Sequence, residues 1–348
     1  MPSEPRFVPL LPPAPDRTPR DALQIGRAHD LAGRLDDAAA SYQESVRLAE
    51  SCGERPILIE ALRRLGVVHH RRGADGLARE LCGRSYRLAV ELGKVVLAGD
   101  ALNALAGFDF ESGQLSAARN HYVNALALAG SCSALLGRIE QNLGILDSVQ
   151  GDHDDAFAHY RRALDAFQQA GDEGGCAIAH HNLGLIECRR GELDRAECSF
   201  ERSAAIATRL GDVYLQGLCE LHRAEASHAR QHYADAMLRA ECALKSFERL
   251  GDGRSKSDAY KVIGKVLRDS GRLALAEERL RTSMRLAVEA GWLLGQAEAS
   301  RELARLHQGN GKKLEALALL KDAHGLYGQL EAKLDLKDID QRIAELAA

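Results

Sequence analysis

Proline is nearly absent from the body of this 348-residue chain. Seven of the eight prolines lie within the first 19 residues, and only Pro56 follows them. Because proline has no amide hydrogen and breaks the interior of a helix, its absence leaves almost the whole sequence free to be helical. We expect the proline-rich residues 1–19 to form an extended or disordered arm rather than a packed segment.

The sequence also lacks long apolar runs, an excess of basic residues and paired cysteines. No stretch approaches the roughly 18 consecutive apolar residues of a transmembrane helix, and Pro9 and Pro12 interrupt the apolar start. The formal net charge is -4, whereas a general nucleic-acid binder is usually basic. The eight cysteines never form a C-x-x-C motif, so we interpret them as free thiols. These features predict a cytoplasmic protein that contacts neither nucleic acid nor membrane.

Motifs for catalysis, metal binding and phosphate binding are missing as well. The sequence contains no Walker loop, G-x-G-x-x-G or G-x-S-x-G motif in a strand-turn-helix context. Cys176 and His180 are one helical turn apart, and His228 and His232 straddle an expected turn, but no complete set of four metal ligands can be assembled. We therefore predict no enzymatic activity, no catalytic residues, no metal and no cofactor.

A repeat of about 40 residues fills the chain. In eight copies a small residue is followed twelve positions later by alanine, and in seven of them a glycine lies between the two. Because glycine tolerates positive φ, each copy is predicted to be two helices joined by a tight turn. The small residues let the two helices approach closely, and a large residue four positions after the alanine fills the adjoining core. The small residues are Gly26, Gly66, Ala106, Gly144, Gly184, Ala224, Gly264 and Ala304, and the alanines are Ala38, Ala78, Ala118, Ala156, Ala196, Ala236, Ala276 and Ala316.

The sixth copy departs most from this pattern. Gln231 stands at the place of the turn glycine, and Arg223 replaces a leucine of the core. We interpret these changes as sequence drift, with a bend or a specialised contact as the alternative.

These features resemble the tetratricopeptide repeat family, whose motif combines L-G-x2-Y with A-x3-F. Residues 142–164 and 182–204 show the pattern most fully. The period of 40 exceeds the common 34 and is similar to that of kinesin light chains and of bacterial peptide-sensing and signalling regulators. The resemblance implies an all-α, right-handed α-solenoid of about eight helix-turn-helix repeats over residues 20–329. We expect residues 330–348 to form a C-terminal capping helix, because they combine apolar and charged residues in an amphipathic pattern.

The resemblance also implies a binding surface on the first helix of each repeat. If the small residue is counted as position 8, the concave wall in this family uses positions 2, 5, 6, 9, 12 and 13. Asn142 and Asn182 fall at position 6, where an amide can donate to and accept from the backbone of an extended peptide. Hydrogen bonds of these amides within the protein are the alternative. The other candidates in this part of the wall are Asn103, Gln141, His181 and Arg189.

Two basic stripes follow on the later repeats. The first comprises Lys261, Lys265 and Arg268, and the second comprises Arg301 and Arg305. Together they can hold an acidic peptide or a C-terminal carboxylate. Acidic residues three or four positions away offer the alternative that the charges neutralise one another. These acidic residues are Asp258, Asp269, Glu298 and Glu302.

The sequence thus predicts a non-catalytic scaffold or adaptor that holds a protein or an extended peptide segment in the concave groove. The alternative is a peptide-responsive regulator whose superhelix changes shape to control a transcription factor or a kinase, or the sensory input part of a signalling system. The expected partners are proteins or peptides, and a homo-oligomer is left open.

Overall fold

The computed structural model describes residues 17–330 and 332–347, and all regular structure in these residues is helical. The prediction of an all-α fold is therefore confirmed. The chain divides into two compact units, Met1–Ala170 and Gly171–Ala348, which are described separately. The arm predicted for residues 1–19 lies mostly outside the described residues, and the first helix begins at Pro19.

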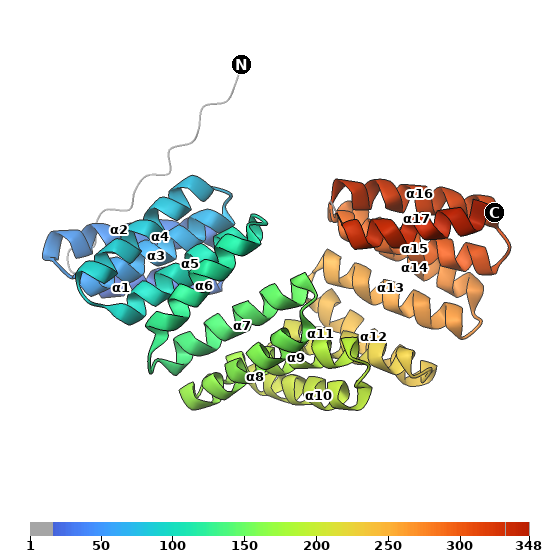
Figure 1. Ribbon diagram of the computed structural model, residues 1–348, viewed down its shortest axis with the longest axis horizontal. Coiled ribbons are helices and arrows are strands. Elements are labelled where there is room, and N and C mark those ends of the chain that lie inside the picture. Colours follow the sequence, from blue (N-terminus) through green and yellow to red (C-terminus); the bar gives the residue numbers. More distant parts are fainter. Residues whose placement is uncertain (1–16, 331, 348) are drawn as a thin grey trace, which may run out of the picture. The chain divides into compact units, whose positions relative to one another are not determined.

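The first unit consists of consecutive helical hairpins (Figure 1). Its helices are α1 (Pro19–Leu31), α2 (Leu35–Cys52), α3 (Arg55–Arg71), α4 (Asp75–Glu91), α5 (Val95–Glu111), α6 (Leu115–Ala129), α7 (Ser133–Gln150) and α8 (His153–Ala170). Each odd-numbered helix, here called an A helix, packs on the even-numbered B helix that follows it. The A helices α1, α3, α5 and α7 also contact one another in order, so their side chains share a continuous face.

The second unit repeats this arrangement and adds one helix at its end. Its helices are α9 (Glu173–Arg189), α10 (Leu193–Leu210), α11 (Val213–Ala229), α12 (Tyr233–Leu250), α13 (Gly253–Asp269), α14 (Leu273–Glu289), α15 (Leu293–Gly309), α16 (Lys313–Gln329) and α17 (Lys333–Ala347). The A helices α9, α11, α13 and α15 contact one another in order. Helix α17 packs on α16, where Ile339 is fully buried in a cluster with Leu320 and Tyr327.

The small residue at position 8 of the A helix determines how closely the two helices of a hairpin pack. A Cβ atom added to Gly26 would lie 2.5 Å from the ring of Tyr42, and one added to Gly184 would lie 2.6 Å from the ring of Phe200. These separations are far below van der Waals contact, so a larger residue requires the partner to move. The same relation joins Gly66 to Cys82, Gly144 to Tyr160 and Gly264 to Leu280. The predicted packing of small against large residues at the helix crossing is confirmed.

Buried carboxylates connect successive hairpins of the first unit. Asp109 on α5 is 2% exposed, and its carboxylate accepts a hydrogen bond from Arg79 Nη1 of α4 at 2.5 Å. Asp147 on α7 is 1% exposed, and it accepts a hydrogen bond from Arg119 of α6 and lies 3.4 Å from His159 Nε2. In both cases the acidic residue is three positions after the small residue of its A helix, and the arginine is one position after the alanine of the preceding B helix.

The same two repeat positions hold different chemistry in the second unit. Leu267 and Met237 belong to one apolar cluster where α13 packs on α12. At the next hairpin boundary His307 Nε2 lies 3.8 Å from Glu277 Oε1, with the acidic residue now on the B helix. The residues that join hairpins therefore form matched pairs that differ from one boundary to the next.

The turn at Gln231 adopts a left-handed backbone conformation. Its φ is 64°, and it is the one non-glycine residue with positive φ among those that the structure describes. The equivalent turn of the next hairpin has Gly271 with φ 81°. The sixth repeat thus keeps the turn geometry although it lacks the glycine that favours this geometry.

We expect Gln231→Gly to raise the free energy of unfolding by about 1 kcal/mol, because a side chain in the left-handed region costs about 1–2 kcal/mol. Urea denaturation followed by circular dichroism measures the change. The matched control is Gly271→Ala, which should lower the free energy of unfolding by a similar amount because it places a side chain at positive φ. No atom lies within 4 Å of the added Cβ, so the backbone conformation is the only cause of the change. A loss of stability in Gln231→Gly would contradict the assignment of strain to this turn.

Candidate functional site

The A helices of the first unit present a group of amides at their shared face. Asn142 Nδ2 on α7 donates a hydrogen bond to Asn103 Oδ1 on α5 at 3.1 Å. Gln141 Oε1, next to Asn142 in the chain, is buried and has no hydrogen-bond partner among the described residues. Asn142 therefore does bond within the protein, as the alternative interpretation held. The acceptor of Gln141 is therefore left unsatisfied within the described residues.

Four arginines lie on the same face of the first unit. We call them the arginine cluster: Arg27 on α1, Arg63 and Arg64 on α3, and Arg138 on α7. Glu60 accepts hydrogen bonds from Arg27 and, at 3.0 Å, from Arg64 Nε. Asp100 pairs with Arg138. The Arg63 guanidinium makes no ion pair or hydrogen bond with a described residue, although the charge of Asp100 acts on it at longer range.

A histidine pair occupies the A helices of the second unit. His181 on α9 is 7% exposed, and its Nε2 lies 3.0 Å from Nδ1 of His222 on α11. Both rings lie 5.7 Å from the ring of Phe200 on α10. Burial, and to a smaller extent the charge of His222, lower the pKa of His181 to about 3, although a hydrogen bond with Asn182 acts in the opposite direction. His181 is thus held as a neutral ring.

The basic stripes predicted on α13 and α15 are paired with acidic residues. Lys261 Nζ donates to Asp258 at 2.7 Å and also bonds Glu298, while Lys265 Nζ lies 3.7 Å from Glu225. Arg268 pairs with Glu302 at 2.6 Å and with Asp269 at 2.7 Å, Arg305 pairs with Glu302 at 2.6 Å, and Arg301 pairs with Asp335 at 3.1 Å. The pairing agrees with the interpretation that these charges neutralise one another, and ligand binding by the stripes stays a prediction.

The other two candidates lie on α9. Asn182 is half-buried beside His181, and Arg189 is exposed at the end of the helix, where it interacts with other residues of the chain. Asn142 and Asn182 belong to different units, so the structure gives each amide its own set of neighbours. That one ligand contacts both Asn142 and Asn182 also remains a prediction.

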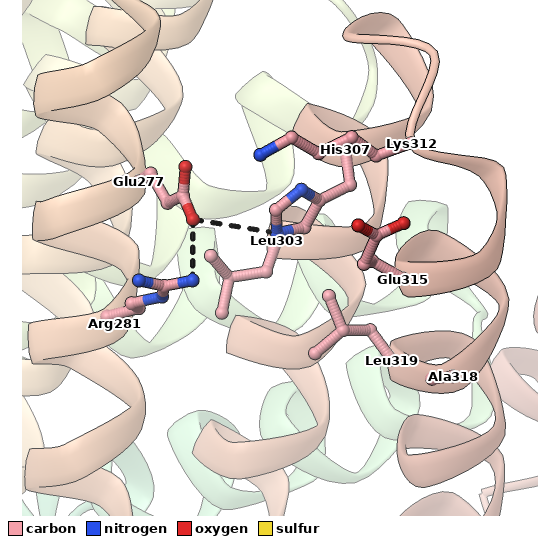
Figure 2. Close-up of a pocket in the computed structure, with 8 residues that line it drawn as sticks. All are labelled: Glu277, Arg281, Leu303, His307, Lys312, Glu315, Ala318 and Leu319. Carbon is pink, nitrogen blue, oxygen red and sulfur yellow. Dashed lines mark ion pairs between the residues drawn. The ribbon is translucent and has the colours of Figure 1, made fainter.

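A partly open pocket of about 360 Å³ lies between α14, α15 and α16 of the second unit (Figure 2). Figure 2 shows the Glu277 carboxylate between Arg281 and His307, with Leu303 and Leu319 along the side of the pocket. Because Glu277 Oε1 lies 2.6 Å from Arg281 Nη2 and 3.8 Å from His307 Nε2, the charges around the acid are balanced. The pocket contains none of the residues predicted from the sequence, and we assign no chemistry to it.

The described part of the chain has neither a group of metal ligands nor a helix suited to a membrane. Across residues 17–330 and 332–347, histidine, cysteine, aspartate and glutamate form no group of three or more that is arranged to hold a metal ion. In the same residues no helix is both long enough and apolar enough to span a bilayer.

A protein-family model provides a test of the resemblance to tetratricopeptide repeats that was found in the sequence. The tetratricopeptide repeat family model matches residues 97–169 and 132–209. Residues 97–209 contain tetratricopeptide repeats. The recognition is confirmed for this part of the sequence, and the same pairing of helices continues on both sides of it. A comparison with curated proteins finds no match to the sequence.

Solved structures of several other proteins share the fold. The signal transduction ATPase with a tetratricopeptide repeat sensor from Pyrococcus horikoshii matches with a TM-score of 0.69 and 14% identity, over 94% of this chain and 50% of that one. This chain therefore spans half the length of that protein. A Rap protein complexed with competence and sporulation factor matches with a TM-score of 0.60 and 13% identity, over 94% and 97% of the chains. BtubC from P. vanneervenii matches with a TM-score of 0.54 and 21% identity, over 61% and 91%.

The arginine cluster was not predicted from the sequence, although the positions of its members in the 40-residue repeat provide a signal for it. Arg63, Arg64 and Arg27 fall at positions 5, 6 and 9 of their A helices, which are wall positions in this family. The later basic stripes attracted attention because their charges are close together in sequence. The partners lie in the next repeat, between 33 and 39 residues away, as in Arg27 with Glu60, Lys261 with Glu298 and Asn142 with Asn103.

Proposed function

We propose that this chain is a non-catalytic scaffold that binds an extended segment of a partner protein on the A-helix face of its first unit. Tetratricopeptide repeats are generally interaction modules without catalytic activity, which supports the non-catalytic part of the proposal. The observation that carries the binding part is the amide group of α5 and α7, where Gln141 Oε1 is buried without a partner beside the Asn142–Asn103 hydrogen bond. An extended backbone supplies the N–H donors and C=O acceptors that amides recognise.

Substitution of the two amides on α7 tests this proposal. We expect Gln141→Ala with Asn142→Ala to lower the affinity for the partner about tenfold, because two hydrogen bonds are lost. Affinity capture from a lysate of the source organism, quantified by mass spectrometry, compares the double variant with the wild type. Partners that depend on the amides are then titrated individually.

The matched control removes two amides from a B helix instead. Asn120 and Asn124 are exposed on α6, and Asn120→Ala with Asn124→Ala should leave every partner bound. Circular dichroism must show equal helix content in both double variants. If the α7 variant retains all partners at wild-type levels, the interface lies elsewhere and the proposal is wrong.

A peptide-responsive regulator is the second candidate function. The likeness to a tetratricopeptide sensor and to a Rap protein bound to competence and sporulation factor supports it. A regulator must change shape when its ligand binds, whereas a scaffold does not need to. Small-angle scattering of the full chain with and without the captured partner segment distinguishes the two, because only the regulator changes its radius of gyration.

A further inference from the structure

The arginine cluster has more positive charges than the carboxylates around it can balance. Glu60 lies between Arg27 and Arg64, and Asp100 pairs with Arg138, so four guanidinium groups share two carboxylates. The other acidic groups that face α3 already have partners of their own. Asp30 pairs with Arg71, and Glu111 lies 3.0 Å from His70 Nε2.

Arg63 is the member of the cluster without an ion pair. It is half-buried on α3, and burial lowers its pKa, an effect that the charge of Asp100 opposes and the charges of Arg64 and Arg138 reinforce. A cation that is partly desolvated among other cations gains stability from any anion that approaches it. In addition, Arg27 Nε is buried without a hydrogen-bond partner among the described residues. The cluster therefore has unused capacity to donate hydrogen bonds to an anion.

An arginine without an ion pair is not a general property of this repeat position, as the second unit shows. Arg301 stands at position 5 of α15, as Arg63 does on α3, but Arg301 Nη1 donates a hydrogen bond to Asp335 at 3.1 Å. Its guanidinium also lies 5.8 Å from the centre of the Tyr327 ring. The same residue type at the same place is thus paired in one unit and unpaired in the other.

We propose that the arginine cluster binds aspartate or glutamate side chains of the partner segment, with Arg63 as the principal contact. The inference rests on the proposed function, which supplies the segment and places its backbone at Asn103, Gln141 and Asn142. Helices α3, α5 and α7 pack in order, so the distance across them is about 20 Å, which about six extended residues can span. One short acidic segment can therefore reach both the arginines and the amides. Carboxylates suit the site because the guanidinium fork matches their geometry.

Fluorescence anisotropy with the full chain tests the inference. The probe is a labelled peptide of about ten residues, long enough to cross the three helices, in which glutamate alternates with serine. The matching peptide with glutamine in place of glutamate serves as the uncharged probe. We expect the glutamate peptide to bind at least about tenfold more tightly, and a rise in ionic strength from about 0.05 M to about 0.5 M to remove most of this preference.

Variants of the chain assign the preference to Arg63. Arg63→Gln should weaken binding of the glutamate peptide about tenfold, and Arg63→Lys, which keeps the charge, should weaken it less. Arg84→Gln, at an exposed arginine of the B helix α4, is the matched control and should leave binding unchanged. Arg301→Gln tests the corresponding position of the second unit. Equal helix content by circular dichroism excludes misfolding as the cause of a loss.

The remaining outcomes overturn the inference in distinguishable ways. Equal binding of both peptides that disappears with Gln141→Ala and Asn142→Ala would leave the proposed function in place and refute the acidic preference. Weakening by Arg301→Gln but not by Arg63→Gln would assign the recognition to the second unit. A phosphoserine peptide that binds far more tightly than the glutamate peptide would replace the carboxylate with a phosphate as the ligand. No binding of either peptide would refute the inference. The proposed function would then be tested separately by the affinity capture experiment.

Discussion

Arg119→Met is expected to lower the free energy of unfolding of the first unit by about 3 kcal/mol, because it leaves a buried carboxylate without its arginine. Asp147 is 1% exposed, and its other polar neighbour, His159 Nε2, lies 3.4 Å away. Adding Asp147→Leu to Arg119→Met should bring the free energy of unfolding back to within about 1 kcal/mol of the wild type, since a matched apolar pair often replaces a buried ion pair without loss. Urea denaturation of the four proteins of this double-mutant cycle measures the coupling free energy between Arg119 and Asp147.

The chain itself provides the reason to expect this rescue. Met237 and Leu267 occupy the corresponding positions at the boundary between α12 and α13, where they belong to one apolar cluster. The control is Arg84→Met, which removes an ion pair between two exposed side chains, Arg84 and Glu50, and should change stability by less than about 1 kcal/mol. A double variant that is no more stable than Arg119→Met would contradict the view that these positions form exchangeable pairs.

Lowering the pH from about 7 to about 5 is expected to destabilise the second unit by about 2 kcal/mol through His181. The folded pKa of His181 is about 3, against 6.5 for an ordinary histidine. Well above pH 6.5 this residue is neutral in both the folded and the unfolded state, so it contributes no dependence on pH. Below that value the unfolded state takes up a proton that the folded state does not, and stability falls by about 1.4 kcal/mol per pH unit until about pH 3.

Urea denaturation at several pH values measures this slope, and His181→Gln should reduce it. His180 also has a pKa lowered by burial and by the charge of Arg202, so part of the slope should remain in the variant. The matched control is His232→Gln, at an exposed histidine of the same unit, which should keep the full slope. An unchanged slope in His181→Gln would show that the His181 side chain accepts a proton in the folded state.

The repeat could be predicted from the sequence because the spacing of the small residues reflects close packing of two helices within one hairpin. Gly184 and Phe200 lie in one hairpin, and the sequence distance between them is fixed by two helices and a turn. The pairing of charges could not be predicted in the same way. Whether a basic residue on an A helix is neutralised depends on the next A helix, as the contact of Arg268 with Glu302 shows.

The proximity of Asn103 and Asn142 could be predicted from the sequence, whereas the pairing of the arginines could not. Counting along the A helix placed Asn103 and Asn142 on one face, and the structure brings them within 3.1 Å. It did not reveal that Arg301 has an acidic partner and Arg63 has none, because the partner Asp335 comes from α17 rather than from a repeat. The left-handed conformation of Gln231 could not be predicted either, because the repeat pattern associates this turn conformation with glycine.

The matched pairs at the hairpin boundaries restrict how this chain can be rearranged during evolution. Deletion of the hairpin formed by α13 and α14 would bring Met237 against His307 and leave the Nε2 of that histidine without Glu277. Deletion of the hairpin formed by α5 and α6 would instead place Arg79 against Asp147, a pair of the type already present there. Loss or duplication of the hairpin formed by α5 and α6 should therefore be tolerated more readily than loss of the hairpin formed by α13 and α14.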